Sequence, residues 1–110
     1  MRLPTHLQVS ALIRRVGGEG GFATVLARGD RDSGTMMVVL SDRGSLSTAY
    51  ERMPQADGTR SWQVSRRQEA DAPFAFGEYL ERRKDQDGDL WIVELDVRDG
   101  ERFIEELDGG

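Results

Sequence analysis

The chain has 110 residues, a net charge of −5 and no cysteine. This length predicts one domain over residues 1–110, and the lack of cysteine excludes disulfides and thiolate metal sites. The negative charge argues against nucleic-acid binding, which requires many contacts to phosphates. No apolar run approaches the ~20 residues that cross a bilayer and no secretory signal is evident, so we expect a cytoplasmic protein without a membrane partner.

The first patterned segment, residues 7–16, alternates apolar and polar side chains. Leu7, Val9 and Ile13 fall on one face of a two-residue period, which is typical of a half-buried strand. We therefore predict a strand here.

The glycine-rich stretch GGEGGFA, residues 17–23, fits two different structures. Its small residues have the G-x-G-x-x-G/A spacing of a dinucleotide-binding loop, and Asp42 follows about 20 residues later, where such a fold places an acid for the ribose. However, residues 22–29 are too few for an ordinary crossover helix, and the chain continues in strands and not in further βα units. We favour a hairpin in which residues 22–28 form a strand antiparallel to residues 7–16.

Strands are also predicted further along the chain. Residues 36–40, MMVVL, are apolar throughout, which indicates a central strand covered on both sides. Residues 45–51, 60–66 and 89–97 alternate apolar and polar side chains, and Asp-, Ser-, Pro- and Gly-rich turns separate these runs.

Two segments have helical patterns. Asp71 is placed to cap a helix that has Pro73 in its first turn and Gly88 just past its end. One face of this helix is lined by Phe76, Tyr79, Leu80 and Arg83. Residues 101–107 fit either a hairpin after Asp99-Gly100 or a short C-terminal helix, and we favour the helix. The predicted fold is therefore α+β: a mainly antiparallel sheet of five to six strands, one packed helix and a short C-terminal helix.

Three blocks of the sequence resemble a known family. MRLPTHLQVSALIRRV, GGFATVLARGDRDSG and DLWIVELDVRDGERF together are similar to a small bacterial family, the domain of unknown function numbered 1491. The three blocks occur in the family's order and extend over nearly the whole chain. The resemblance implies a freestanding, cytoplasmic bacterial protein of this size, and it brings no assigned activity or catalytic residue.

Charge is unevenly distributed along the chain. Residues 1–67 contain ten arginines and six acids, a balance of +4, whereas residues 68–110 have a balance of −9. Mutual neutralisation of the two parts in the fold explains this more simply than a dedicated binding face. A basic face is the alternative, and its candidate anion- or ligand-binding residues are Arg14, Arg15, Arg28, Asp30 and Arg31.

The segment ARGDRDSGT, residues 27–35, contributes three of those candidates. Asp30, Asp32 and Ser33 are residues that close Asx-type turns, so we favour a hairpin between two core strands. An anion held by the loop's N–H groups with Arg28 or Arg31 is the functional alternative.

Asp85, Asp87 and Asp89 have the spacing of a calcium-binding loop, but Leu90 stands where such a loop needs glycine. We therefore predict no metal and no cofactor. His6 is the only histidine and there is no cysteine nucleophile, so triad or dyad chemistry has little support. Whether the protein is an enzyme stays open.

These observations predict a non-enzymatic accessory or interaction protein that forms a homodimer or binds a protein partner. The alternative is a small anion- or nucleotide-binding enzyme that uses the Arg-rich N-terminal face.

Overall fold

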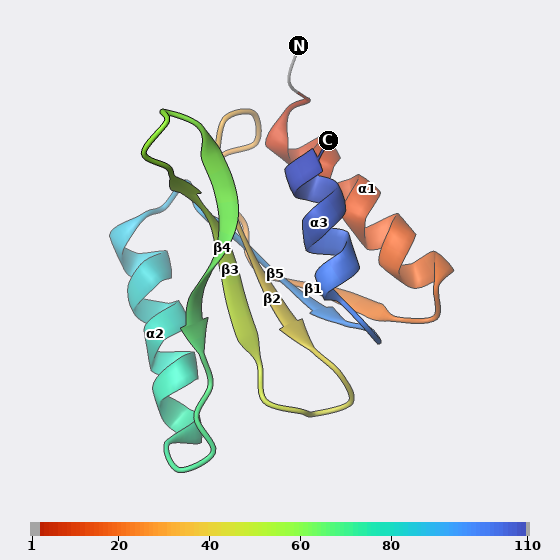
Figure 1. Cartoon of the computed structure of the whole chain (residues 1–110), viewed down its shortest axis with the longest axis vertical. Coiled ribbons are helices and arrows are strands. Elements are labelled where there is room, and N and C mark those ends of the chain that lie inside the picture. Colours follow the sequence, from red (N-terminus) through yellow and green to blue (C-terminus); the bar gives the residue numbers. More distant parts are fainter. Residues whose placement is uncertain (1–2, 110) are drawn as a thin grey trace.

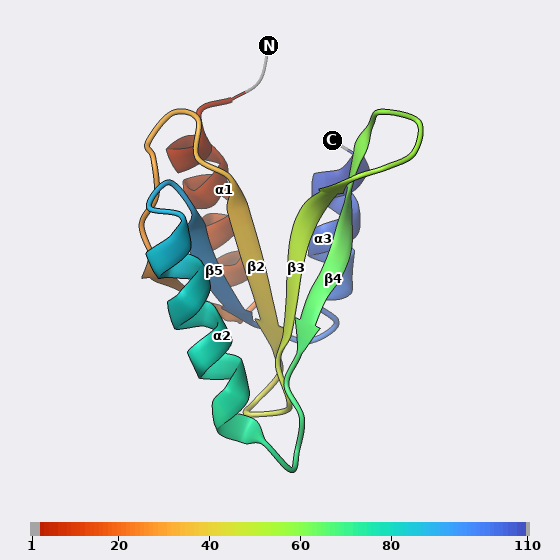
Figure 2. The same ribbon diagram turned by 90° about the vertical axis from the view of Figure 1, so that its left-hand side faces the viewer.

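The structure is a computed structural model that describes residues 3–109. The elements follow in the order α1 (Thr5–Gly18), β1 (Phe22–Ala27), β2 (Met36–Ser41), β3 (Thr48–Pro54), β4 (Arg60–Arg67), α2 (Pro73–Gln86), β5 (Trp91–Asp96) and α3 (Glu101–Gly109). The strands form one sheet in the order β1-β5-β2-β3-β4, in which β2 and β5 are parallel and the other neighbours antiparallel. Helices α1 and α3 cover one face and α2 lies on the other (Figures 1 and 2). The predicted α+β fold with a mainly antiparallel sheet and a C-terminal helix is confirmed.

Strand β2 lies in the middle of the sheet and is buried on both faces. Met36, Val38 and Leu40 join the core under α1 and α3, whereas Met37 and Val39 join the core under α2. The prediction of a central strand at MMVVL is therefore confirmed. The other predicted strands are also present as β3, β4 and β5.

The prediction of a strand at residues 7–16 is wrong, because these residues belong to α1. The buried side chains are Val9, Leu12 and Val16, which recur at helical spacing, and Leu7 is exposed. Leu7, Val9 and Ile13 fit a two-residue period, whereas Val9, Leu12 and Val16 fit a helical one, so local pattern could not separate the two structures. The core decides in favour of the helix, since α1 places these side chains against the sheet and Phe103.

The predicted hairpin between residues 7–16 and 22–28 is also wrong. Residues 22–27 do form a strand, but β1 pairs antiparallel with β5, with Phe22 opposite Asp96. Residues 17–21 therefore connect a helix to a strand. The helix that a dinucleotide-binding loop needs after its glycines does not occur at residues 22–27.

The loop at residues 28–35 is likewise not the predicted hairpin between core strands, because β5 lies between β1 and β2. The loop crosses the start of β5 instead: the backbone N–H of Asp30 donates to Asp89 O at 3.0 Å, and the indole N–H of Trp91 donates to Asp30 O at 2.7 Å. A Cβ at Gly29 or Gly34 would collide with the backbone of Asp89. The expected Asx turn is present: Asp30 Oδ2 accepts the Asp32 N–H at 3.2 Å, and it also accepts the Ser33 N–H at 2.8 Å.

Helix α2 begins as predicted with a proline, but its N-cap residue is Ala72, and no side chain caps it. The predicted Asp71 cap is wrong because this residue stands one position too early to reach the free N–H groups of the first turn. Gly88 follows the end of α2 as expected. Within residues 3–109, no helix is long and apolar enough to cross a membrane.

Candidate functional site

The two edge strands of the sheet differ in charge. Strand β4 contains Arg60, Arg66 and Arg67, and charged side chains of this kind protect a sheet edge from pairing with another chain. Strand β1, with the sequence FATVLA, contains neither a charged residue nor a proline. Its outer edge is therefore the one that the sequence leaves open to a partner strand.

Strand β1 also exposes apolar side chains. Ala23 and Val25 pack against the core under α1, whereas Phe22 and Leu26 are 75% and 40% exposed. The pairing with β5 is regular from Phe22 to Val25 and shifts register before Ala27. The regular part of the edge is thus four residues long and begins at an exposed phenylalanine.

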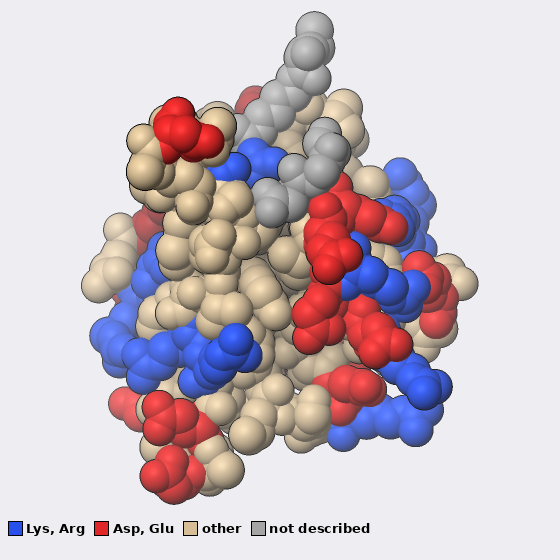
Figure 3. Space-filling view, viewed as in Figure 1, with Lys and Arg blue, Asp and Glu red and all other residues tan. Residues whose placement is uncertain are grey.

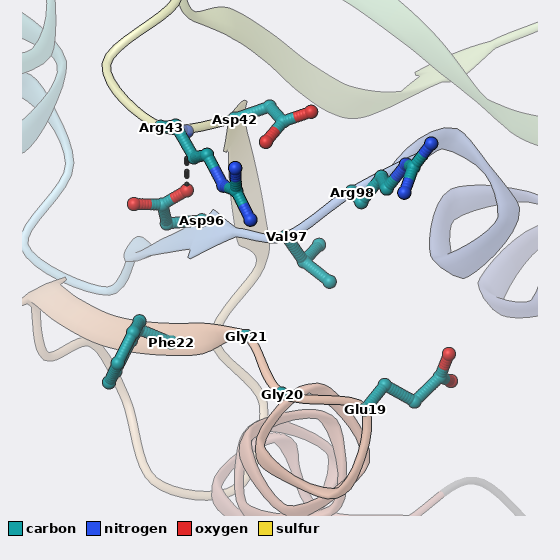
Figure 4. A pocket seen from close by; sticks show the side chains of 9 residues that line it. All are labelled: Glu19, Gly20, Gly21, Phe22, Asp42, Arg43, Asp96, Val97 and Arg98. Carbon is teal, nitrogen blue, oxygen red and sulfur yellow. Dashed lines mark hydrogen bonds between the residues drawn. The ribbon is translucent and has the colours of Figure 1, made fainter.

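A pocket of about 460 Å³ opens where β1 begins and where the parallel strands β2 and β5 end (Figure 4). We refer to it as the end pocket. Its lining consists of Glu19, Gly20, Gly21, Phe22, Asp42, Arg43, Asp96, Val97 and Arg98. Phe22 belongs both to this pocket and to the open edge, so the two features form one continuous surface.

The glycines of GGEGGFA build one wall of the end pocket. The Gly21 N–H donates to Val16 O at 3.0 Å and the Gly20 N–H to Gly17 O at 3.2 Å, with Gly20 at φ +84°. These bonds form a Schellman motif that ends α1. Because both N–H groups are used and a helix C-terminus carries partial negative charge, the loop is unsuited to a pyrophosphate. The dinucleotide interpretation of this stretch is therefore wrong.

Arg43 has an unusual backbone conformation at the opposite wall. It lies at φ +51° and is followed by Gly44 at φ +78°, a pair of left-handed residues for which Asn-Gly is the favoured sequence. The Arg43 N–H donates to the Asp96 carboxylate at 2.9 Å. Figure 4 shows Arg43 and Arg98 on one side of Val97, with the glycines on the other.

Some charged side chains of the end pocket have partners within the fold and others do not. The Glu19 carboxylate forms an ion pair with Arg102, and the Asp96 carboxylate accepts the Arg43 N–H. Within residues 3–107, neither the Arg43 nor the Arg98 guanidinium has an ion-pair partner. Two of the three acids that line the pocket are therefore already engaged, and Figure 4 shows the Arg98 side chain extending away from Arg43.

A second hollow, of about 310 Å³, lies beside the β3–β4 hairpin. The pairing of β2 with β3 ends at Met37 and Glu51, but β3 and β4 stay paired up to Pro54 and Arg60, so the hairpin projects beyond β2 (Figure 2). The hollow lies between this projecting hairpin and the start of α1. Its lining includes Thr5, Gln8, Glu51, Arg52, Arg60, Trp62 and Arg83.

An ion pair across the second hollow is partly buried. Glu51 Oε2 lies 2.5 Å from the Arg83 guanidinium and accepts the Tyr79 hydroxyl at 3.2 Å. Burial opposes ionisation of Glu51, but the bonds from Arg83, Ser65 and Tyr79 outweigh it and lower its pKa, while the bond to Glu51 raises the pKa of Arg83. Both groups therefore stay charged near neutral pH. The pair joins α2 to β3.

The five predicted anion-binding residues do not converge. Arg14 and Arg15 lie in the last turns of α1, where Arg15 pairs with Glu106 and its guanidinium lies 5.3 Å from the Phe103 ring centroid. Figure 3 shows further acidic side chains gathered over α3. This ion pair joins the basic first part of the chain to the acidic second part.

The other three candidates are near the opposite end of α1. The Arg28 guanidinium lies 5.5 Å from the Trp91 ring centroid, and the Arg31 carbonyl accepts the His6 N–H at 3.0 Å. The hydrogen bonds from Ser33 lower the pKa of Asp30. His6 and Arg15 are about 13 Å apart along the helix at 1.5 Å per residue, so the structure forms no single site from the five residues. Anion binding by any of them stays a prediction.

The acids that resemble a calcium loop form a turn, in which the Asp87 carboxylate accepts the Asp89 N–H at 3.0 Å. No group of three or more His, Asp or Glu side chains suited to a metal occurs in the described part of the chain.

Sequence reasoning missed the open edge and the end pocket. The absence of charge in FATVLA was visible, but nothing local indicated that β1 lies at an edge. The pocket combines residues 19–22, 42–43 and 96–98, which only the pairing of β1, β5 and β2 brings together.

The fold and this surface define a small α+β domain with a mixed sheet, one charged edge and one uncharged edge. The chain belongs to the family described as Protein of unknown function (DUF1491), whose sequence pattern matches residues 3–105. The resemblance seen in the three sequence blocks is thereby confirmed.

Solved structures of relatives have the same fold. An NMR structure of a DUF1491 family protein from Caulobacter crescentus CB15 is 35% identical, with a TM-score of 0.77 and 94% of each chain covered. A crystal structure of a DUF1491 family protein from the same organism is 35% identical, with a TM-score of 0.73, covering 90% of this chain and 92% of that one. The solution structure of protein Atu0922 from A. tumefaciens is 32% identical, with a TM-score of 0.67, covering 90% and 89%. No curated protein matches the chain.

Proposed function

We propose that this chain acts as one domain, as a non-enzymatic interaction protein of the bacterial cytoplasm, and that it binds a partner strand along β1. The observation that carries the proposal is the contrast between the two edges: β4 carries three arginines, whereas β1 carries no charge and exposes Phe22 and Leu26. An added strand would bond to the free backbone groups of β1 and cover both side chains. The lack of cysteine supports the cytoplasmic location.

The partner strand can come from a second copy or from another protein. Two β1 strands can pair antiparallel about a twofold axis. Because β1 contains no charged residue, this pairing brings no like charges together, and a homodimer is compatible with this edge. Light scattering over a wide concentration range distinguishes the two cases, because only self-association gives a mass that rises with concentration.

The test replaces the exposed apolar side chains and leaves the fold intact. The double variant Phe22→Ser/Leu26→Ser removes apolar surface from the edge, and Phe74→Ser removes an even more exposed phenylalanine (84%) from α2 as a matched control. We expect the double variant to lose any concentration-dependent mass and Phe74→Ser to retain it.

A photo-crosslinking residue at position 24 tests the case of another protein partner. In host cells we expect an adduct from position 24 that disappears in the Phe22→Ser/Leu26→Ser background, and none from position 74. If the protein is monomeric at every concentration and position 24 also gives no adduct, the proposal is refuted.

A further inference from the structure

We infer that the partner strand at β1 is β1 of a second copy of this chain, and that the two strands pair antiparallel about a twofold axis at Thr24. This inference rests on the proposed strand addition at β1 and names the partner and the register of that addition. The observation behind it is that β1 is complementary to itself.

The sequence of β1 is nearly symmetric about Thr24. From Phe22 to Leu26 it contains a large apolar residue, a smaller one, threonine, a smaller apolar residue and a large one. Side chains alternate along a strand, so Phe22, Thr24 and Leu26 point to one face and Ala23 and Val25 to the other. Burial agrees with this alternation, because Ala23 and Val25 pack against the core under α1 and the other three are exposed.

A twofold axis makes this symmetry useful. In such an interface, residue i of one copy opposes residue j of the other, and j opposes i. Directly opposite side chains of an antiparallel pair lie on the same face, with Cβ atoms about 4.5–5.5 Å apart. With the axis at Thr24, Phe22 of each copy therefore opposes Leu26 of the other. The two apolar side chains that β1 exposes cover each other twice in the dimer.

Neighbouring registers do not cover these side chains. If the axis is shifted by one residue towards the start of β1, Phe22 opposes Thr24 of the second copy and Leu26 opposes a glycine. If it is shifted by one residue the other way, Phe22 opposes Arg28. Burial of apolar surface favours the register that brings Phe22 and Leu26 together.

The backbone of β1 allows this pairing. Its pairing with β5 is regular from Phe22 to Val25, and the register shift lies between Val25 and Ala27. The irregularity thus falls at Leu26, the last residue that the second copy requires. Because β1 contains no proline, none of these residues lacks an N–H donor for the new ladder.

Helix α1 adds an uncharged flank above the same edge. Arg15 faces α3, where it pairs with Glu106, and helical spacing places Ser10, Ile13 and Gly17 on the opposite flank. Helix α1 covers the side of the sheet on which β1 lies (Figure 1). The twofold axis brings these flanks of the two copies towards each other. Small residues at such a contact allow two helices to pack closely.

The test replaces the opposing apolar side chains by charges and measures the dissociation constant of the dimer by sedimentation equilibrium. Phe22→Lys and Leu26→Glu alone each place a charge opposite an apolar side chain. Combined in one chain, they place the lysine at position 22 opposite the glutamate at position 26 of the second copy. Each dimer then contains this ion pair twice.

Two controls accompany these variants. Phe22→Lys/Thr24→Glu tests the register, because an axis at Thr24 places its two glutamates opposite each other. Phe74→Lys introduces the same charge at a phenylalanine of α2 that is 84% exposed. All the substituted side chains are exposed, and thermal unfolding checks that each variant is folded.

We expect each single variant at β1 to raise the dissociation constant about tenfold or more, because apolar burial is lost. Phe22→Lys/Leu26→Glu should bind about tenfold more tightly than the product of the two single effects predicts, because its cross-strand pairs are of opposite charge. Phe22→Lys/Thr24→Glu should show no such gain, and Phe74→Lys should keep the wild-type constant.

The outcomes separate this inference from the proposed function. A double variant that shows no gain over the product of the single effects, or a gain in Phe22→Lys/Thr24→Glu instead, would overturn pairing about Thr24 and leave strand addition at β1 in place. A wild type that is monomeric at every concentration would overturn the inference as a whole. The proposed function would then depend on whether position 24 crosslinks to another protein.

Discussion

The GGEGG loop predicts opposite effects for the same substitution at glycines two residues apart. Gly18 is the last residue of α1, has no atoms within 4 Å of an added Cβ, and does not have a positive φ. Gly20 has equally open surroundings but lies at φ +84°. The difference between the two positions is therefore conformational and not steric.

The magnitudes follow from backbone preferences. Gly18→Ala favours the helix and reduces the freedom of the unfolded chain, so we expect stabilisation of about 0.5 kcal/mol. Gly20→Ala forces an alanine into the left-handed region, which costs about 1–2 kcal/mol. Gly21→Ala places a Cβ 2.8 Å from Asp96 O and 2.8 Å from Val97 Cβ, so we expect a loss of about 2–3 kcal/mol.

Urea unfolding followed by tryptophan fluorescence measures these changes, with Trp91 as a probe inside the core. For a domain of this size, 1 kcal/mol corresponds to about 4–8 °C in Tm, so thermal unfolding provides a second measurement. The m-value should stay constant, because the surface exposed on unfolding does not change. The reasoning is refuted if Gly18→Ala and Gly20→Ala shift stability in the same direction, or if Gly20→Ala is as stable as the wild type.

Three further predictions concern contacts within the fold. Glu51→Gln removes the charge that faces Arg83 in a half-buried pair, and we expect a loss of about 1–2 kcal/mol in urea unfolding; a change near zero would show that solvent screens the pair. Trp91→Phe removes the indole N–H bond to the 28–35 loop and leaves a small cavity, so we expect it to lower the free energy of unfolding by about 2 kcal/mol. Hydrogen exchange of the loop amides should become faster, and an unchanged exchange rate would contradict the role of Trp91 in holding the loop. The pKa of Asp30 is lower in the folded chain, so its contribution is complete above the unfolded pKa of about 4 and is lost as pH falls. Asp30→Asn should therefore lose less stability than the wild type between neutral pH and about pH 3, and identical acid profiles would refute this assignment.

The pattern of apolar and polar residues predicted an element correctly where it was compatible with only one type of secondary structure. An uninterrupted apolar run such as Met36–Leu40 must be covered on both faces, and β2 is. The alternation in residues 91–97 separates Val93 and Leu95 on one face from Ile92 on the other, as the two cores require. The helix between Pro73 and Gly88 also followed from its spacing and its proline.

Residues 7–16 show where local pattern was insufficient. Their apolar side chains fit a strand as well as a helix, and valine and isoleucine favour neither strongly enough to decide. The structure is determined by α1 packing Val9, Leu12 and Val16 against the sheet, which involves residues distant in sequence. The error then propagated, because the supposed strand provided the wrong partner for β1.

The amino-acid sequence by itself determined the class of fold, most of its elements and the contrast in charge between FATVLA and RSWQVSRR, because these depend on residue type and short-range periodicity. Only the tertiary structure decided that β5 inserts between β1 and β2, since strand order depends on contacts between segments far apart in the chain. That insertion places β1 at the edge, brings Arg43 and Arg98 to the same pocket, and uses the glycines of GGEGGFA to end a helix. The candidate site thus arises from strand order, which no local pattern encodes.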